Sequence, residues 1–349
     1  MKNKFSKIMA LALSSLVVPF CASCNTTGSG DKMSIVTTIF PEYDWVMNIL
    51  GEKKDNADVT LLLDNGIDLH SYQPTPKDIV TISKCDLFIY VGGESDEWVD
   101  DALKQAINKD MKVINLMETL GDAIKEEEVI EGMEGHDHDH EHGEEDHDHE
   151  EEDHDHEEED HDHDHDHEEE VEFDEHVWLS LKNAASICET IEKGIEKIDP
   201  TNAKTYKDNL ASYKEKLNTL DANYKAAVDA STIKTLVFGD RFPFRYMVDD
   251  YALDYYAAFV GCSAETEASF ETIVFLAGKI DELGLHSVLT IEGNDHRIAE
   301  AVVANTATKD QKILTMNSLQ STTSADVKKG VSYVSVMNEN LNTLKEALK

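Results

Sequence analysis

The chain has 349 residues, with 72 acidic and 31 basic side chains and a formal net charge of −41 at neutral pH. This charge repels nucleic acid and anionic lipid headgroups and attracts cations, so nucleic-acid binding is excluded. The length suits two domains or two lobes of one protein.

The N-terminus predicts an export signal over residues 1–23. Three lysines among the first seven residues precede the apolar stretch IMALALSSLVVPF, which is too short to span a bilayer. Small Ala22 and Ser23 directly before Cys24 resemble a bacterial lipobox, in which the cysteine is lipidated and becomes the new N-terminus. A cleaved secretory signal without lipid is the alternative. Residues 24–32 then form a flexible tether.

Three cysteines remain after processing at Cys24, and they show neither a C-x-x-C pair nor an even disulfide framework. Cys85 and Cys188 are expected to be small, buried apolar residues. Cys262 lies in a possible site region, and its role stays open.

The first part of the chain alternates strand and helix patterns. The predicted strands cover residues 33–40, 57–63, 86–93 and 112–117. The predicted helices cover residues 43–51, 75–85 and 96–107. This order implies a mostly parallel sheet covered by helices.

An acidic region interrupts the alternation from about Glu126 to Glu175, and we expect it to be disordered because it cannot bury apolar surface. Residues 136–170 contain only His, Asp, Glu and one Gly, with a seven-residue tandem repeat of the type EEDHDHE. A solvated acidic linker would explain the carboxylates but not twelve alternating histidines. These are His136, His138, His140, His142, His147, His149, His154, His156, His161, His163, His165 and His167.

Histidines at every second residue of an extended segment lie on one face, about 6.5–7 Å apart. A flexible loop can therefore fold two or more imidazoles around one zinc ion. We expect several weak sites of poor selectivity, because each binding event must order loose chain. Metal retention is expected to fall as the pH drops through roughly 6–7.

A helical pattern over 181–198 is broken by Asp-Pro, and a long helix is predicted over 201–230. At 1.5 Å per residue it spans roughly 45 Å, long enough to join two lobes. The alternation then restarts. The later strands are 235–239, 254–260, 287–293 and 312–316, and the later helices are 244–251, 269–284, 297–306 and 331–349.

The predicted fold is α/β, with two lobes that are each a mostly parallel sheet flanked by helices, joined by one long rigid helix. The N-terminal lobe is expected over 33–200 with a disordered loop at 126–175, and the C-terminal lobe over 231–349. Ligands of open α/β sheets bind beyond the carboxyl ends of the strands, where two such lobes face each other. Polar residues at predicted strand ends or in adjoining loops are His70, His176, Asp240, Arg241, Glu292 and Asn317.

Several segments together resemble a known family: TTIFPEYDWVMNILG, DLHSYQPTPKDI, GGESDEWVDDAL, DEHVWLS and DPTNAKTYKDNLASYKEKLNTLD. The chain is similar to the metal-binding (cluster 9) substrate-binding proteins of bacterial ABC transporters for zinc or manganese, over nearly the whole mature chain. The resemblance implies two α/β lobes with the metal between them. A histidine-rich insertion between the first two metal histidines is typical of the zinc-specific members.

The resemblance also implies where the metal ligands lie. The first and second ligands match His70 and His176. The third, a histidine, falls in RFPFRY on Arg241, with Tyr246 as the anchor of the match, and the fourth, an acid, falls in TMNSLQS on Asn317. Two of the four ligands are therefore replaced.

Two histidines leave zinc under-coordinated, since it favours four ligands. We expect one or two nearby carboxylates to complete the site, with Asp240, Glu267 and Glu292 as the candidates; Glu267 matches a glutamate common in the family. Arg241 cannot ligate a metal but can hold a carboxylate in place.

The function expected from these features is capture of Zn²⁺ outside the cell and delivery to an ABC permease, without catalysis. We expect a monomer that is lipid-anchored at the outer face of the cytoplasmic membrane, or periplasmic. An extracellular metal buffer or adhesin of the same fold is the alternative, and Mn²⁺ or Fe²⁺ in the cleft stays open. A metallohydrolase ranks third, because no motif such as H-E-x-x-H is present.

Overall fold

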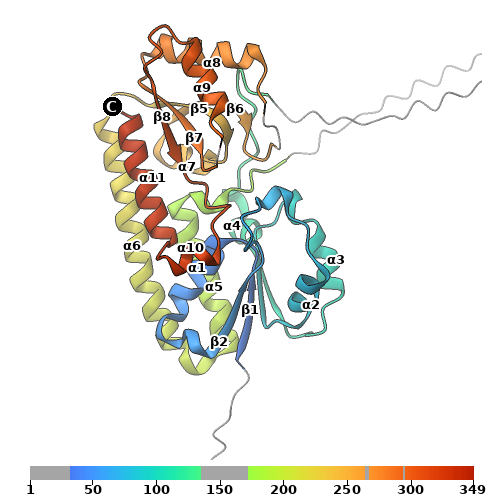
Figure 1. Ribbon diagram of the computed structural model, residues 1–349. Helices are drawn as coiled ribbons and strands as arrows, with labels where there is room; N and C mark the ends of the chain where they lie inside the picture. The colour runs from blue at the N-terminus through green and yellow to red at the C-terminus, as the bar shows by residue number, and fades with distance from the viewer. Residues whose placement is uncertain (1–31, 135–171, 264–266, 294) are drawn as a thin grey trace, which may run out of the picture. The chain divides into compact units, whose positions relative to one another are not determined.

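The computed structural model describes residues 32–134, 172–263, 267–293 and 295–349 (Figure 1). The predicted export signal, Cys24 and all twelve histidines of the predicted metal-gathering loop (residues 136–170) lie outside these residues. None of the helices in the described ranges combines the length and the apolar character that a membrane crossing requires.

Two four-stranded parallel sheets form the framework, as the sequence predicts. In spatial order, the first sheet contains β2 (Ala57–Leu61), β1 (Met33–Thr37), β3 (Leu87–Tyr90) and β4 (Lys112–Asn115). The second contains β6 (Asp254–Val260), β5 (Thr235–Phe242), β7 (Ser287–Ile291) and β8 (Lys312–Met316). In each sheet the strand that comes first in the sequence, β1 or β5, lies in an inner position, and later strands lie on both sides of it. In such an order the carboxyl ends of the strands border a natural ligand position.

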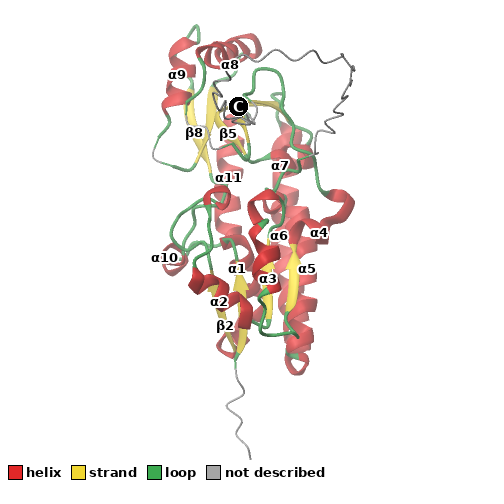
Figure 2. Ribbon diagram, turned by 90° about the vertical axis from the view of Figure 1, so that its right-hand side faces the viewer, coloured by secondary structure: helices red, strands yellow, loops and turns green. Residues whose placement is uncertain are grey.

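Helices cover both faces of the first sheet, which explains why its strands are apolar on both sides. Ile35 and Leu87 point into the main core, beneath α1 (Phe40–Leu50), α4 (Leu116–Leu120) and α5 (Leu181–Ile198). Val36 and Phe88 point to the opposite face, where α2 (Pro76–Lys84) and α3 (Trp98–Lys104) pack (Figure 2).

The second sheet is covered in the same way. Phe238 and Leu289 belong to the main core on the side of α7 (Arg245–Tyr251) and α11 (Tyr333–Ala347). Val237 and Val288 face α8 (Phe270–Leu283) and α9 (Arg297–Asn305), which pack on the other side. The short helix α10 (Ser324–Lys328) precedes α11 in the chain.

The helix α6 (Ala203–Ala230) joins the two lobes, as its predicted length suggests. It packs against α1 and α5 of the first lobe and against α7 and α11 of the second (Figure 1). Tyr213 donates a hydrogen bond to Asp44 on α1 at 3.2 Å, and Tyr224 donates to the carbonyl of Met337 on α11 at 2.7 Å. The main hydrophobic core is one continuous cluster that includes residues of both sheets and of α6. The lobes therefore share a core instead of meeting only at a hinge.

The first strand and helix are divided differently from the prediction. The strand ends at Thr37 and the helix already begins at Phe40, with Pro41 in its first turn. Proline is tolerated there because the first N–H groups of a helix have no partner within it. The buried carboxylate of Glu42 accepts hydrogen bonds from the N–H groups of Thr38 and Ile39, which fixes this start.

The predicted strand 112–117 is also too long, because its last two residues open α4. Asn115 caps this helix by accepting a hydrogen bond from the N–H of Glu118 at 3.0 Å. An asparagine at this position stabilises a helix start better than a strand end.

Both borders of the acidic region form hydrogen-bonded contacts, although the sequence predicts disorder over 126–175. Glu126 forms an antiparallel bridge with Phe173. The backbone N–H of Glu134 donates to the carbonyl of Ala258, and its carboxylate accepts a hydrogen bond from Thr272 at 2.6 Å. The expectation is therefore wrong for residues 126–134 and 172–175, while the expectations for 135–171 fall outside the described residues.

Candidate metal centre

His70 is held by hydrogen bonds that leave one ring nitrogen directed toward the space between the lobes. It lies in a short 3₁₀ turn (Leu69–Ser71) after β2, and its backbone N–H donates to the carboxylate of Asp68 at 3.0 Å. The ring Nδ1 lies 2.7 Å from the hydroxyl of Ser95 and 3.3 Å from a carboxylate oxygen of Glu175. These acceptors favour a proton on Nδ1, which leaves the lone pair on Nε2 for a metal.

His176 is completely buried and is oriented by its own sequence neighbours. The carboxylate of Asp174 lies 2.8 Å from the backbone nitrogen of His176 and 3.1 Å from its Nδ1. The ring packs against Trp178, with 5.2 Å between the ring centroids. Tyr246 donates to the carbonyl of Asp174 at 2.7 Å and so ties this segment to the second lobe. The segment DEHVW thus supplies a ligand and the groups that orient it.

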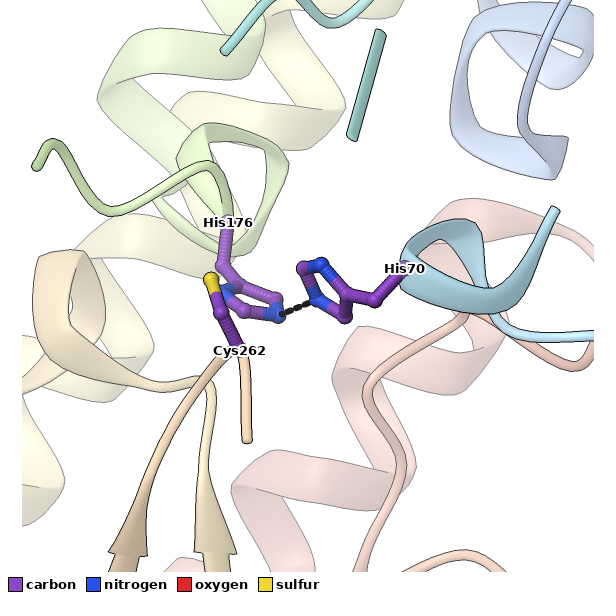
Figure 3. Close-up of side chains that lie close together, drawn as sticks. All are labelled: His70, His176 and Cys262. Carbon is purple, nitrogen blue, oxygen red and sulfur yellow. Dashed lines mark hydrogen bonds between the residues drawn. The ribbon is translucent and has the colours of Figure 1, made fainter. Parts of the chain in front are cut away.

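The two imidazoles meet with their Nε2 atoms 3.2 Å apart (Figure 3). Cys262 joins them, and its Sγ atom and one ring nitrogen of each histidine all lie within 4.8 Å of one another. Among the described residues, this is the group of His, Cys, Asp and Glu side chains that could hold a metal ion. The chain thus brings together the two histidines that the sequence predicts and a cysteine whose role the sequence leaves open.

Carboxylates surround this group and make its surroundings negative. Burial lowers the pKa of His176, but Asp174, Glu175 and Asp68 outweigh that effect and raise it overall. Burial raises the pKa of Glu175, but the hydrogen bond and the charge of His70 outweigh burial and lower this pKa overall. The carboxyl therefore stays ionised to a lower pH than usual. A negative environment of this kind favours a divalent cation.

Arg241, where the family resemblance implies the third ligand, points its guanidinium at polar partners of both lobes. One nitrogen donates to the carboxylate of Asp68 at 2.8 Å, and another donates to the carbonyl of Ser263 at 3.2 Å. Asn317, at the fourth position, accepts a hydrogen bond from the N–H of Leu319 at 2.7 Å. Asn317 thereby shapes the loop after β8.

The three carboxylates proposed as replacement ligands are not part of the group around His70. Asp240 accepts hydrogen bonds from the backbone N–H groups of Arg241 and Ile291. Glu292 is engaged by the backbone N–H and the hydroxyl of Ser318, at 2.6 and 2.7 Å. Burial raises the pKa of both carboxyls. The third candidate, Glu267, is exposed.

A cavity of about 630 Å³ lies beside the group. Its lining includes Asp68, Arg241, Glu292, Asn317 and Gln320. The side-chain amide of Gln320 also lies 3.2 Å from Nε2 of His176, which places it next to the ligating nitrogen. Arg241 and Asn317 therefore border the polar space next to the histidines.

The sequence leaves the role of Cys262 open and does not single out the carboxylates that orient the histidines. The cysteine follows the strand pattern DYYAAFV, and a position just after a strand end is a usual place for ligand-binding groups. The acids Asp174 and Glu175 adjoin His176 in sequence, and carboxylates commonly hydrogen-bond to the second ring nitrogen of a metal-binding histidine.

Comparisons with known proteins show the family of the chain. The family model described as ZnuA, zinc-uptake complex component A periplasmic, matches residues 35–347. The zinc-binding lipoprotein AdcA of Streptococcus pneumoniae (strain ATCC BAA-255 / R6) is 31% identical over 347 residues, which cover 97% of this chain and 61% of the relative. The chain thus spans about three fifths of the length of that relative. The high-affinity zinc uptake system protein ZnuA of Bacillus subtilis (strain 168) is 29% identical over 352 residues, covering 100% of this chain and 99% of the relative.

Solved structures show the same fold. The Zn(II)-bound ZnuA-like domain of Streptococcus pneumoniae AdcA matches with a TM-score of 0.64 and 26% identity, covering 91% of this chain and 99% of that chain. The metal-dependent lipoprotein YcdH from Bacillus subtilis matches with a TM-score of 0.67 and 24% identity, covering 91% of this chain and 99% of that chain. The second match supports the fold alone.

Proposed function

The chain belongs to the zinc-uptake complex component A family, and on that premise we propose that it captures Zn²⁺ outside the cytoplasm and delivers it to an ABC permease. The observation that supports this proposal most directly is a pair of imidazoles from different parts of the chain. Their Nε2 atoms lie 3.2 Å apart. Zinc bonds of about 2.0–2.1 Å to two nitrogens in a tetrahedron require a separation of roughly 3.3 Å. His70 and His176 therefore already stand at the spacing of two ligands of one ion.

The arrangement supports binding of a cargo ion and no chemical conversion. Both histidines have orienting partners on Nδ1, which is the usual support for a metal ligand. The protein acts as a monomer in this proposal, and the histidine-rich loop gathers zinc near the site. The names of the relatives, zinc-binding lipoprotein and zinc uptake system protein, support the same role.

The ligand assignment is tested by replacing His70 and His176 with alanine in a variant that lacks residues 136–170. Removing the loop eliminates twelve competing histidines, so one tight zinc site is expected in this background. The double substitution is expected to weaken that site about 100-fold or more, because it removes both nitrogen ligands. Isothermal titration calorimetry measures the stoichiometry and the affinity.

The matched control is His286→Ala in the same background. His286 is exposed just before β7, so its replacement is expected to leave zinc affinity unchanged. Unfolding curves of the three proteins establish that the substitutions leave the fold intact. One tight site that survives in the His70→Ala/His176→Ala variant would contradict the assignment.

We also propose that Cys24 carries a lipid that anchors the chain to the outer face of the cytoplasmic membrane. Replacement of Cys24 by alanine is expected to move the protein from the membrane fraction to the soluble extracytoplasmic fraction. Cys21→Ala is the matched control and is expected to stay membrane-bound. Fractionation followed by immunoblotting measures the distribution, and a Cys24→Ala protein that remains in the membrane fraction would refute the anchor.

A further inference from the structure

Cys262 reaches the two histidines because the chain turns sharply after β6. Gly261 precedes it, and a Cβ atom at this position would lie 2.9 Å from Cε1 of His176 and 2.9 Å from the carbonyl oxygen of Phe242. Only a glycine lets the turn approach His176 this closely. The sulfur then stands within 4.8 Å of a ring nitrogen of each histidine.

The turn that carries the cysteine is fixed from several sides. The N–H of Ser263 donates to the carbonyl of Val260 at 3.3 Å, and the N–H of Cys262 donates to the carboxylate of Glu127 at 3.3 Å. The guanidinium of Arg241 donates to the carbonyl of Ser263. A side chain on a turn with these restraints is pre-positioned, as a metal ligand needs to be.

Arg241 lies near the end of β5, and Cys262 follows the end of the neighbouring strand β6. Arginine has no lone pair to offer a metal. The family resemblance places a histidine at position 241. Arg241 instead donates hydrogen bonds to the carbonyl of Ser263, in the turn after β6, and to the carboxylate of Asp68 beside His70. The loss of a ligand on β5 and the supply of a sulfur after β6 are therefore structurally linked.

We propose that Cys262 binds the captured zinc through its sulfur, as the third protein ligand beside His70 and His176. This inference rests on the proposed function and specifies the ligand set of the same site. A Zn–S bond of about 2.3 Å and Zn–N bonds of about 2.0–2.1 Å put the three atoms roughly 3.3–3.6 Å apart, so a spacing of up to 4.8 Å must shorten when the ion binds. One position of the tetrahedron is left for an exchangeable oxygen ligand.

The thiol must lose its proton when the metal binds. Burial, with Asp174, Glu127 and Glu175 nearby, raises the pKa of the Cys262 thiol well above its usual range, so the metal-free side chain is neutral. On binding, the S–H bond breaks, a Zn–S bond forms, and the proton passes to the solvent; no oxidation is involved. The chain then gains a ligand that soft ions prefer.

A thiolate ligand determines which ions the site selects. Sulfur favours Zn²⁺, Co²⁺ and Cd²⁺, whereas Mn²⁺ and Mg²⁺ prefer oxygen ligands. A site of two imidazoles and one thiolate therefore discriminates against manganese more strongly than a site completed by carboxylates. The cargo class that follows is thiophilic divalent cations, with zinc as the abundant member.

The test uses the full chain with one equivalent of Co²⁺ as a spectroscopic probe. A thiolate-to-cobalt charge-transfer band in the ultraviolet is expected for the unmodified protein and for Cys85→Ala, whose buried cysteine lies in another core. The band is also expected in a variant with Cys21 and Cys24 replaced by alanine. It is expected to disappear in Cys262→Ser, and the zinc affinity of that variant is expected to fall at least about tenfold.

The outcomes separate this inference from the proposed function. A Cys262→Ser protein with unchanged zinc affinity and unchanged preference for Zn²⁺ over Mn²⁺ would overturn the sulfur ligand, even where His70→Ala/His176→Ala loses binding. The same holds if the unmodified protein shows no charge-transfer band. Loss of the band in Cys262→Ser, with an unfolding curve like that of the unmodified protein, supports direct ligation over a structural role.

Discussion

Replacing Trp178 with alanine is expected to lower the free energy of unfolding by about 3–5 kcal/mol, which is the usual cost of truncating a fully buried tryptophan. The indole N–H donates to the carbonyl of Ser318 in the second lobe at 2.8 Å. The carbonyl of Trp178 accepts a hydrogen bond from Tyr333 on α11 at 2.7 Å. Because the ring also packs on His176, zinc affinity is expected to fall in the same variant. Urea denaturation of the zinc-free protein and calorimetry measure the two effects.

Phenylalanine substitutions separate the ring from its hydrogen bond. Trp178→Phe keeps most of the apolar contact but leaves a buried carbonyl without its donor, so a cost of about 1–3 kcal/mol is expected. Trp45 is equally buried, and its indole N–H has no hydrogen-bond partner among the described residues. Trp45→Phe is therefore the matched control, and a smaller cost is expected. Equal costs for the two phenylalanine variants would contradict the role given to the Ser318 contact.

Local patterns in the sequence predict the framework because each strand and helix needs its own spacing of apolar residues. Apolar runs bounded by turn residues predict all eight strands, and the spacing of apolar residues between 201 and 230 predicts α6 at Ala203–Ala230. The predicted boundaries are wrong where a single side chain determines where a helix begins. The hydrogen bond to Glu42 fixes the start of α1 at Phe40, earlier than predicted. The cap from Asn115 begins α4 where the prediction continues a strand. Such contacts shift boundaries without changing the order of the elements.

The site was less predictable, because its composition depends on which loops meet. His70 and His176 could be found from motifs that each lie within one segment. The role of Cys262 depends on the approach of β6 to the segment around His176, which no local pattern encodes. Asp240 and Glu292 were reasonable candidates from their positions at strand ends. Their oxygens are instead used to hold backbone N–H groups of neighbouring strand ends.

The loss of Arg241 is expected to produce the second large effect on stability. Its guanidinium, 19% exposed, pairs at 2.8 Å with Asp68, 23% exposed, and so connects β5 of the second lobe to the loop of His70. Arg241→Ala leaves a largely buried carboxylate without its cation, and a cost of about 2–4 kcal/mol at neutral pH is expected. Arg241→Ala/Asp68→Asn is expected to recover part of that loss, with a coupling energy of about 1–3 kcal/mol. Chemical denaturation of the four zinc-free proteins gives the cycle.

The pH dependence of this pair follows from Asp68. Burial raises its pKa, but His70 and Arg241 outweigh burial and hold it below the ordinary value of 3.8. A carboxyl with a lowered folded-state pKa stabilises the protein above its unfolded pKa, and that contribution disappears as the pH falls through the folded-state value. The difference in unfolding free energy between the unmodified protein and Arg241→Ala is therefore expected to be largest at neutral pH and to shrink as the pH falls below the unfolded-state pKa of about 3.9. It does not vanish, because the hydrogen bond from Arg241 to the Ser263 carbonyl does not titrate.

An exposed ion pair provides the control for the arginine. Lys225 and Asp229 pair at 3.0 Å on α6, and both side chains are well exposed. Lys225→Ala is expected to cost only about 0–1 kcal/mol, with little coupling to Asp229. A cost for Arg241→Ala no larger than this would show that the pair with Asp68 does not hold the His70 loop against the second lobe. A large cost that stays constant from neutral pH to about pH 3 would assign the effect to the Ser263 contact instead.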